Sequence, residues 1–459
     1  MKSISDFETA SMSPSAENDT ASTAGASALG GGASSIPTSS QPNPQGSPPA
    51  TSTPQSASAS SLTSTPSASA SPAATPNSSS MTSVVDIGYE LAGKNLVPDC
   101  ATDSNFNSCL FWKNPVAQTG AILSGHGLTT STDLSSVQID AVNIPSGWYD
   151  NSGYLQNPTI KVYLDQTSNT AARVTTAAGN FKFAYANDAN RKVTQTMVFY
   201  WLMTEVNFFK ERVGKFYAEN HGVVVFASDS TLQNNAYFSL TDHTLHAGRD
   251  DQGVDLAVGA EIVLHEMGHA NAFFSSNGGI HIASGGQTAD GYCTTARAGS
   301  LCCRDKFGCA SGIDEGQADH HAGLVFISDP ALGQTWFNNL NGVVDCGIAR
   351  NAVKNLNLTA DEVYLSCGNS GAGSNFNGEI HIMGALYASI WYALAATARA
   401  TGGADAVDID KLFSEHLKVL TGADNFPSVY AKLRAIDSSL FGGKFGTAIQ
   451  AEFKKRNLI

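Results

Sequence analysis

The sequence predicts an α+β fold, with a β-rich N-terminal lobe and a mainly helical C-terminal lobe. Before residue 191, short segments alternate between apolar and polar residues and are separated by Gly, Asn, Asp and Pro. From residue 192 onward, apolar residues recur mostly at helical spacing. The 459 residues are 42% apolar, which is enough for a large core. We divide the chain into 1–83, 84–191 and 192–459.

The first segment, 1–83, is predicted to be a disordered tether. From about Ser11 to Ser83 it consists almost entirely of Ser, Thr, Ala, Pro, Gly and Asn. This composition buries too little apolar surface to offset chain entropy. Such a tether can hold a folded domain away from a cell envelope. A spacer without a specific role is the simpler interpretation.

The second segment, 84–191, has two strand-like stretches, Val137–Ile144 and Thr159–Leu164. Cys100 and Cys109 are close enough in sequence to close a small disulfide loop. We expect this region to be the β-rich first part of the folded unit rather than a separate inhibitory module.

The third segment, 192–459, begins with two predicted helices, Val193–Tyr217 and Asp255–Phe274, with strands between them. The predicted strands are Gly222–Ala227, Asn234–Leu240 and Thr244–Ala247, and the last two form a hairpin.

The C-terminal tail, Ile380–Ile459, is predicted to form three or four helices. The predicted breaks are Gly402–Gly403, Gly422–Pro427 and Gly442–Gly443. The most apolar run, Ile382–Ala398, is shorter than the 18 residues or so of a membrane span. We expect a buried helix there and no transmembrane segment.

A metal-binding pattern occupies the second predicted helix, at His265-Glu266-Met-Gly-His269. Residues four apart lie on one helix face, so His265 and His269 can bind one cation together. Glu266 lies one step round the helix, where it can take a proton from water beside the metal. Zinc lowers the pKa of such water to about 7 and polarises carbonyl groups. The alternative is a helix whose two histidines make ordinary hydrogen bonds.

A third ligand is needed, because catalytic zinc sites use three protein ligands. The stretch Gly312-Ile-Asp314-Glu315-Gly-Gln-Ala-Asp319 is predicted to start a helix with projecting acidic residues. Together with the first motif, it resembles the gluzincin zinc metallopeptidases of the thermolysin and fungalysin group, and is closer to fungalysin. The resemblance covers about Thr194 to the C-terminus. It implies a thermolysin-like fold with zinc in a cleft between the two lobes.

The same resemblance implies roles for the acidic residues. Glu315 corresponds to the third zinc ligand, Asp319 to the group that orients His265, and Asp314 to the group that orients His269. Histidine ligands usually donate their other ring N–H to such a carboxylate.

His381 is the second catalytic residue that the resemblance implies. Gly378-Glu-Ile-His381-Ile-Met-Gly384 is similar to a fungalysin stretch in which a His precedes a helix and donates a hydrogen bond to the oxyanion. His281 lies in a stretch similar to the corresponding one in thermolysin. We favour His381, because the family places this His after the third ligand. Tyr292 is the nearest match to the oxyanion-binding Tyr of the family.

Two further sites follow from the resemblance. Asn235 and Ala236 resemble the Asn-Ala edge strand that pairs with the substrate backbone, although an ordinary edge strand is the alternative. Relatives often bind calcium, and Asp250 and Asp251 are candidate ligands for Ca²⁺. A solvated turn is the simpler interpretation of that acidic pair.

The chain departs from the family in a long insertion between His269 and Glu315. The insertion contains Cys293, Cys302, Cys303 and Cys309. We expect a disulfide-tied loop there, with a second metal site as the alternative, although no Cys-x-x-Cys pair occurs. His320 and His321 directly follow the third-ligand motif. We expect both to be structural rather than ligating.

The sequence thus predicts a zinc-dependent endopeptidase that acts on proteins or peptides as a monomer. The alternative is a surface adhesin or structural protein with a vestigial or structural zinc site, although such a site has no need of Glu266. The eight cysteines and the tether predict an extracellular or cell-surface location, but no apolar export signal follows Met1. A net charge of −14 argues against nucleic acid as a partner.

Overall fold

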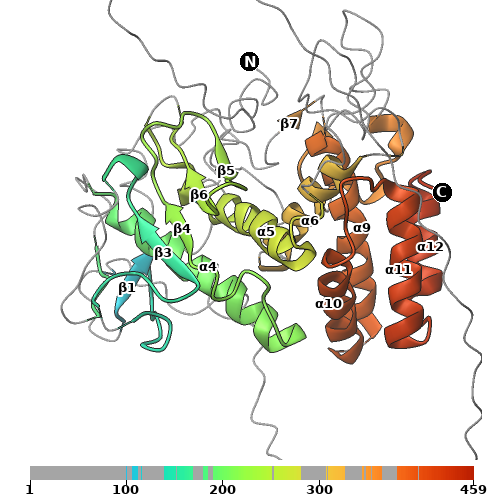
Figure 1. Cartoon of the computed structure of the whole chain (residues 1–459), viewed down its shortest axis with the longest axis horizontal. Coiled ribbons are helices and arrows are strands. Elements are labelled where there is room, and N and C mark those ends of the chain that lie inside the picture. The colour runs from blue at the N-terminus through green and yellow to red at the C-terminus, as the bar shows by residue number, and fades with distance from the viewer. Residues whose placement is uncertain are drawn as a thin grey trace, which may run out of the picture. The chain divides into compact units, whose positions relative to one another are not determined.

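The computed structural model describes residues 100, 106–111, 115, 139–150, 152–168, 179–183, 190–250, 253–280, 307, 309–325, 344–345, 348–352, 354–363, 380–401 and 403–459. These residues combine small sheets, mostly in the first part, with helices that dominate the second part (Figure 1). The predicted α+β class is confirmed at this coarse level. The predicted tether lies outside the described residues.

The main described sheet has four strands in the order β3 (Ile160–Tyr163), β4 (Val223–Phe226), β6 (Thr244–Ala247) and β5 (Ala236–Phe238). β3, β4 and β6 are parallel to one another, whereas β5 is antiparallel to β6. The predicted hairpin is therefore confirmed, and β5 lies at an edge of the sheet. Because β3 precedes residue 192, the second and third segments of the chain share this sheet.

Two smaller sheets consist of paired short strands. β1 (Ser108–Leu110) pairs with β2 (Asp140–Val142), and β7 (Val344–Asp345) pairs with β8 (Ile348–Ala349). β2 is shorter than the predicted strand 137–144. Near its end the backbone N–H of residue 144 donates to a side-chain oxygen of residue 107, which replaces the backbone pairing. The predicted disulfide between Cys100 and Cys109 is present.

The first long helix, α4 (Lys192–Val213), has 22 residues. Most of its side chains are buried, including the aromatic rings of Phe199, Phe208 and Phe209. The helix ends four residues before the predicted end, because Gly214 adopts a left-handed conformation with φ of 87° and caps it. A glycine tolerates this conformation without steric cost.

The helix that carries the metal-binding pattern, α5 (Ala260–Ser276), begins later than predicted. The chain first makes a short 3₁₀ turn at Leu256–Val258, and Gly259 is then extended. The predicted first residue, Asp255, is fully buried and accepts hydrogen bonds from Thr194 and Ser228 instead of capping the helix.

The acidic motif 314–319 lies in the next described helix, α6 (Ala310–Val325), which begins two residues before the predicted start at Gly312. The N–H of Ile313 donates to the carbonyl of Cys309 in its first turn. Glu315 and Asp319 are four residues apart, so they lie on the same face of this helix, one turn from each other.

The tail forms four helices, separated at the predicted glycines. They are α9 (Ile380–Thr401), α10 (Gly403–Leu417), α11 (Phe426–Phe441) and α12 (Gly446–Lys455). α11 starts with a capping box between the side chains and backbones of residues 425 and 428, and ends at a left-handed glycine, Gly442.

Most buried apolar residues of the sheet and of the helices named above belong to one hydrophobic core, and Ala236, Leu256 and Ile262 form a second, small cluster. α5 packs on β5, β6 and α4 and, on another side, on α6, which in turn packs on α9 (Figure 1). Among the described helices, α9 is long and apolar enough to cross a membrane, but 78% of its most apolar stretch is buried. The position of α5 and α6 between sheet and tail helices determines where the chemistry-bearing residues meet.

Candidate metal centre

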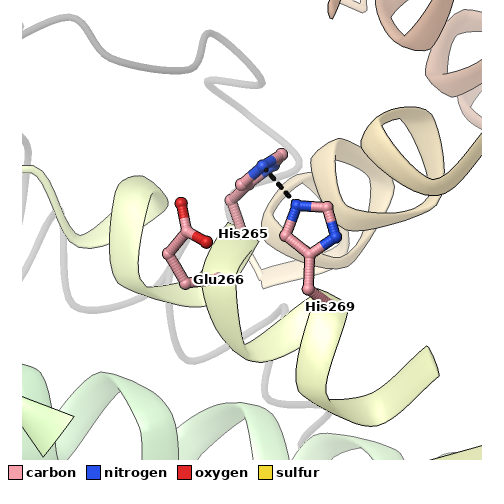
Figure 2. Close-up of side chains that lie close together, drawn as sticks. All are labelled: His265, Glu266 and His269. Carbon is pink, nitrogen blue, oxygen red and sulfur yellow. Dashed lines mark hydrogen bonds between the residues drawn. The ribbon is translucent and has the colours of Figure 1, made fainter. Parts of the chain in front are cut away.

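His265, Glu266 and His269 project from the second and third turns of α5 (Figure 2). The two imidazole rings point toward each other, and their Nε2 atoms lie 3.0 Å apart. The carboxylate of Glu266 belongs to the same cluster, in which the ligand-type atoms lie within 4.8 Å of one another. The i, i+4 spacing thus places the two histidines as the sequence predicts.

The other ring nitrogen of each histidine faces a carboxylate on α6. Nδ1 of His265 lies 2.9 Å from Asp319, and Nδ1 of His269 lies 2.9 Å from Asp314. If each Nδ1 carries the proton and donates it to its carboxylate, the Nε2 atoms present lone pairs to each other. Two lone pairs 3.0 Å apart repel unless a cation lies beside them. This donor set therefore fits a metal ion.

Glu315 completes a three-ligand arrangement. One of its carboxylate oxygens lies 3.3 Å from Nε2 of His265, and the other lies 3.7 Å from Nε2 of His269. With zinc–ligand bonds of about 2.0–2.2 Å, tetrahedral ligands lie about 3.3–3.6 Å from one another. The three spacings of 3.0, 3.3 and 3.7 Å lie around this range, and all three residues are mostly buried.

The electrostatic field of the cluster favours a cation. Burial by itself would lower the pKa of His269, but Asp314, Glu315 and Glu266 outweigh it and raise that pKa to about 10. Burial would raise the pKa of Glu315, but the neighbouring histidines, His381 first among them, hold it well below its usual value. The site thus stabilises positive charge on its nitrogens and negative charge on its oxygens.

His381 lies in the first turn of α9, which begins at Ile380, where the helical tail is predicted to begin. Its side chain is 1% exposed, and its Nε2 lies 3.8 Å from a carboxylate oxygen of Glu315. The residue is therefore beside the candidate metal ligands, although more than a hundred residues separate it from His265 along the chain. The rival candidate, His281, lies outside the described residues, as does Tyr292.

Arg350 is a site residue that the sequence reasoning missed. It directly follows β8, and its guanidinium donates to Asp319 at 2.6 and 3.3 Å and to Glu315 at 3.1 Å. Burial raises the pKa of Asp319, but Arg350 and His265 outweigh burial and hold that pKa below its usual value. No motif surrounds Arg350 in the sequence, so no local signal identifies it.

The predicted substrate-binding strand is present, at the edge of the sheet. Asn235 and Ala236 are 3% and 4% exposed. Ala236 packs against Leu256 and Ile262, which lead into the first turns of α5. The carbonyl of Asn235 accepts a hydrogen bond from the N–H of Gly248. The strand is therefore fixed to the helix that carries the metal-binding pattern, and its pairing with a substrate stays a prediction.

The remaining predicted residues lie elsewhere or outside the described part of the chain. His320 packs between the rings of Trp391 and Phe413, and His321 bonds to Glu205, so neither joins the cluster. Cys309 is disulfide-bonded. Asp250 accepts a hydrogen bond from a backbone N–H within its own turn. The calls that fall outside the described residues are Asp251, Cys293, Cys302 and Cys303.

No protein-family model matches the chain, and no curated protein matches it.

Proposed function

We propose that the chain is a zinc-dependent endopeptidase of the gluzincin type, with a thermolysin-like arrangement of its two parts around the metal centre. The observation that carries the proposal is the convergence of His265, His269 and Glu315. The two helices α5 and α6 bring their ligand-type atoms within 3.0–3.7 Å of one another. A carboxylate lies 2.9 Å from Nδ1 of each histidine, as is usual for histidines that bind a metal through Nε2.

Those three residues would hold the zinc ion, and Asp319 and Asp314 would fix the orientation of the two imidazoles. The metal supplies Lewis acidity, which acidifies water and polarises the scissile carbonyl. A structural zinc site has four protein ligands, whereas a catalytic site has three and leaves one position for water or substrate. Among the described residues the proposed ligands number three, which supports a catalytic site.

Glu266 acts as the general base. Its carboxylate is 6% exposed and belongs to the same cluster as the two histidines, but it lies one residue round the helix from His265. From this position it takes a proton from the attacking water and passes it to the leaving amine. Positioned groups of this kind contribute roughly 10²–10⁴-fold to the rate.

His381 is proposed to interact with the oxygen of the scissile carbonyl. It is buried 3.8 Å from the Glu315 carboxylate, so its ring N–H is within reach of a group bound next to that ligand. A hydrogen bond to the developing oxyanion is typically worth about 3–4 kcal/mol.

The substrate is proposed to be a protein or peptide that adds as a strand to β5, alongside Asn235 and Ala236. An edge strand offers the backbone groups that such pairing needs. The disulfide between Cys100 and Cys109 supports an oxidising location, so we place the enzyme outside the cell or at its surface, as a monomer.

The test compares casein cleavage by the full chain and by Glu266→Gln, each with and without a chelator. We expect the unaltered chain to lose activity with the chelator and to regain it with zinc. Glu266→Gln should retain zinc but lose at least about 10²-fold in rate. Glu211→Gln, which changes an exposed carboxylate on α4, serves as the control. Cleavage that survives both treatments would refute the mechanism, and a zinc-free, inactive chain would favour an adhesin or structural protein.

A further inference from the structure

Three glycines lie beside the residues of the metal centre, one on each helix that contributes to it. Gly268 immediately precedes His269 on α5, and Gly316 immediately follows Glu315 on α6. Gly384 lies three residues after His381, almost one turn further along α9. A helix interior normally disfavours glycine, by about 1 kcal/mol relative to alanine. Some gain elsewhere must therefore account for the glycines.

Two of these glycines meet where α6 crosses α9. A Cβ atom on Gly316 would lie 2.4 Å from the carbonyl oxygen of Gly384 and 2.7 Å from Cβ of Tyr387. A Cβ atom on Gly384 would lie 2.6 Å from Cβ of Glu315 and 2.8 Å from the backbone nitrogen of Gly316. Real Cβ contacts essentially never fall below 3.0 Å, so the two backbones touch directly.

The third glycine, Gly268, allows a similarly close approach of the backbones where α5 crosses α6. A Cβ atom on Gly268 would lie 2.9 Å from Cα of Ala318 and 3.0 Å from Cβ of His321. These neighbours are a backbone atom and the stem of a buried side chain, so neither can rotate away. This contact is slightly looser than the one between α6 and α9.

Each close contact is within four residues of a group in the metal centre. A methyl group at Gly316 or Gly384 would push α9 away from α6, and with it His381 away from Glu315, which are now 3.8 Å apart. A methyl group at Gly268 would separate the histidines on α5 from Glu315 on α6. Metal sites tolerate errors of only about 0.2 Å in ligand distance.

We infer that Gly268, Gly316 and Gly384 are positioning residues, whose missing side chains set the distances between the metal ligands and His381. This inference rests on the proposed zinc site. It goes beyond that site, because it assigns the ligand geometry to the helix crossings and not to the ligand side chains alone.

Gly323 provides a matched control on α6. It lies about two turns after Gly316, inside the same helix, and a Cβ atom there would meet no atom of the described residues within 4 Å. Gly323→Ala therefore introduces the same methyl group and the same gain in helix propensity without a clash. It should raise the unfolding temperature slightly and leave metal binding unchanged.

The experiment measures the zinc affinity of the full chain by competition with a chromophoric chelator. The absorption spectrum of the Co²⁺ form reports the coordination geometry, and thermal unfolding of the metal-free form reports stability. We expect Gly316→Ala and Gly384→Ala to weaken zinc binding by about tenfold or more and to change the Co²⁺ spectrum. Gly268→Ala should have a smaller effect of the same kind, and Gly323→Ala none.

The outcomes separate the two proposals. Failure of the unaltered chain to bind zinc would overturn the zinc site and the inference together. Zinc binding by the unaltered chain, with equal affinity and an unchanged Co²⁺ spectrum in folded Gly316→Ala and Gly384→Ala, would overturn the inference alone. If those two variants do not fold, Gly268→Ala decides by the same readouts. Loss of folding in all three would also overturn the inference, in favour of a purely structural role.

Discussion

The buried histidine His416 of α10 should make the protein less stable as the pH falls below about 6.5. Its side chain is fully buried, and burial lowers its pKa to about 3, while the charges of Asp424 and Lys432 act on it in opposite directions. The hydroxyl of Tyr387 and Nε2 of His416 share a hydrogen bond of 2.9 Å, and Nδ1 has no partner in the described structure. Protonation would therefore bury a charge and leave the Nδ1–H without an acceptor.

The sign and size of the effect follow from the two pKa values. In the unfolded chain His416 titrates near 6.5, whereas the folded chain keeps it neutral down to about 3. Between these values the unfolded state binds one more proton, so the free energy of unfolding falls as the pH falls. From pH 6 to pH 5 this single group accounts for a loss of about 1.2 kcal/mol.

The assay is urea unfolding of the metal-free full chain at pH 6 and pH 5, compared with His416→Gln. Glutamine keeps an acceptor for the Tyr387 hydroxyl but cannot take up a proton. The variant should therefore lose about 1.2 kcal/mol less than the unaltered chain over this interval. His221→Gln, at an exposed position, is the control and should not alter the loss. Equal losses in the unaltered chain and His416→Gln would refute the reasoning.

Three further predictions concern other buried groups. Burial raises the pKa of Glu205 well above its usual value, so its stabilising contribution is present at low pH and is lost as the pH rises. Urea unfolding should therefore show that Glu205→Gln stabilises the chain more at pH 7 than at pH 5. Arg350→Met removes the guanidinium from the buried Asp319 carboxylate, and should lower the free energy of unfolding by about 3 kcal/mol by the same assay. Cys109→Ser removes the disulfide between Cys100 and Cys109, which lie 9 positions apart in sequence. Calorimetry should show that this lowers the free energy of unfolding by about 2–3 kcal/mol.

Local patterns predicted the secondary structure well wherever burial follows a simple period. The histidine spacing on α5 and the acidic spacing on α6 are properties of a single helix, so sequence spacing translates directly into geometry. Helix ends were less predictable, because they depend on distant partners. α5 begins after Gly259 because Asp255 is already engaged by Thr194 and Ser228, which come from other elements.

The role of Arg350 illustrates what the sequence does not encode locally. Its partners, Asp319 and Glu315, lie on a different element, α6, more than 30 residues earlier in the chain. Only the folded chain shows that the Arg350 guanidinium already neutralises part of the negative charge of the carboxylates in the candidate metal centre. The negative charge available to a metal is thus smaller than the acidic motif suggests.

The adjacent pair His320 and His321 shows why histidines that look alike in sequence differ in function. The amide oxygen of Asn271 accepts N–H groups of residues 217 and 218, so its amide nitrogen must donate to Nε2 of His321. The other nitrogen, Nδ1, then carries the proton and donates to Glu205. Both nitrogens of His321 are occupied, and burial lowers its pKa to about 3. In His265, by contrast, a carboxylate holds Nδ1 while Nε2 faces the Nε2 of the second α5 histidine. The partner of the second nitrogen, rather than the presence of the ring, therefore separates a candidate ligand from a structural histidine.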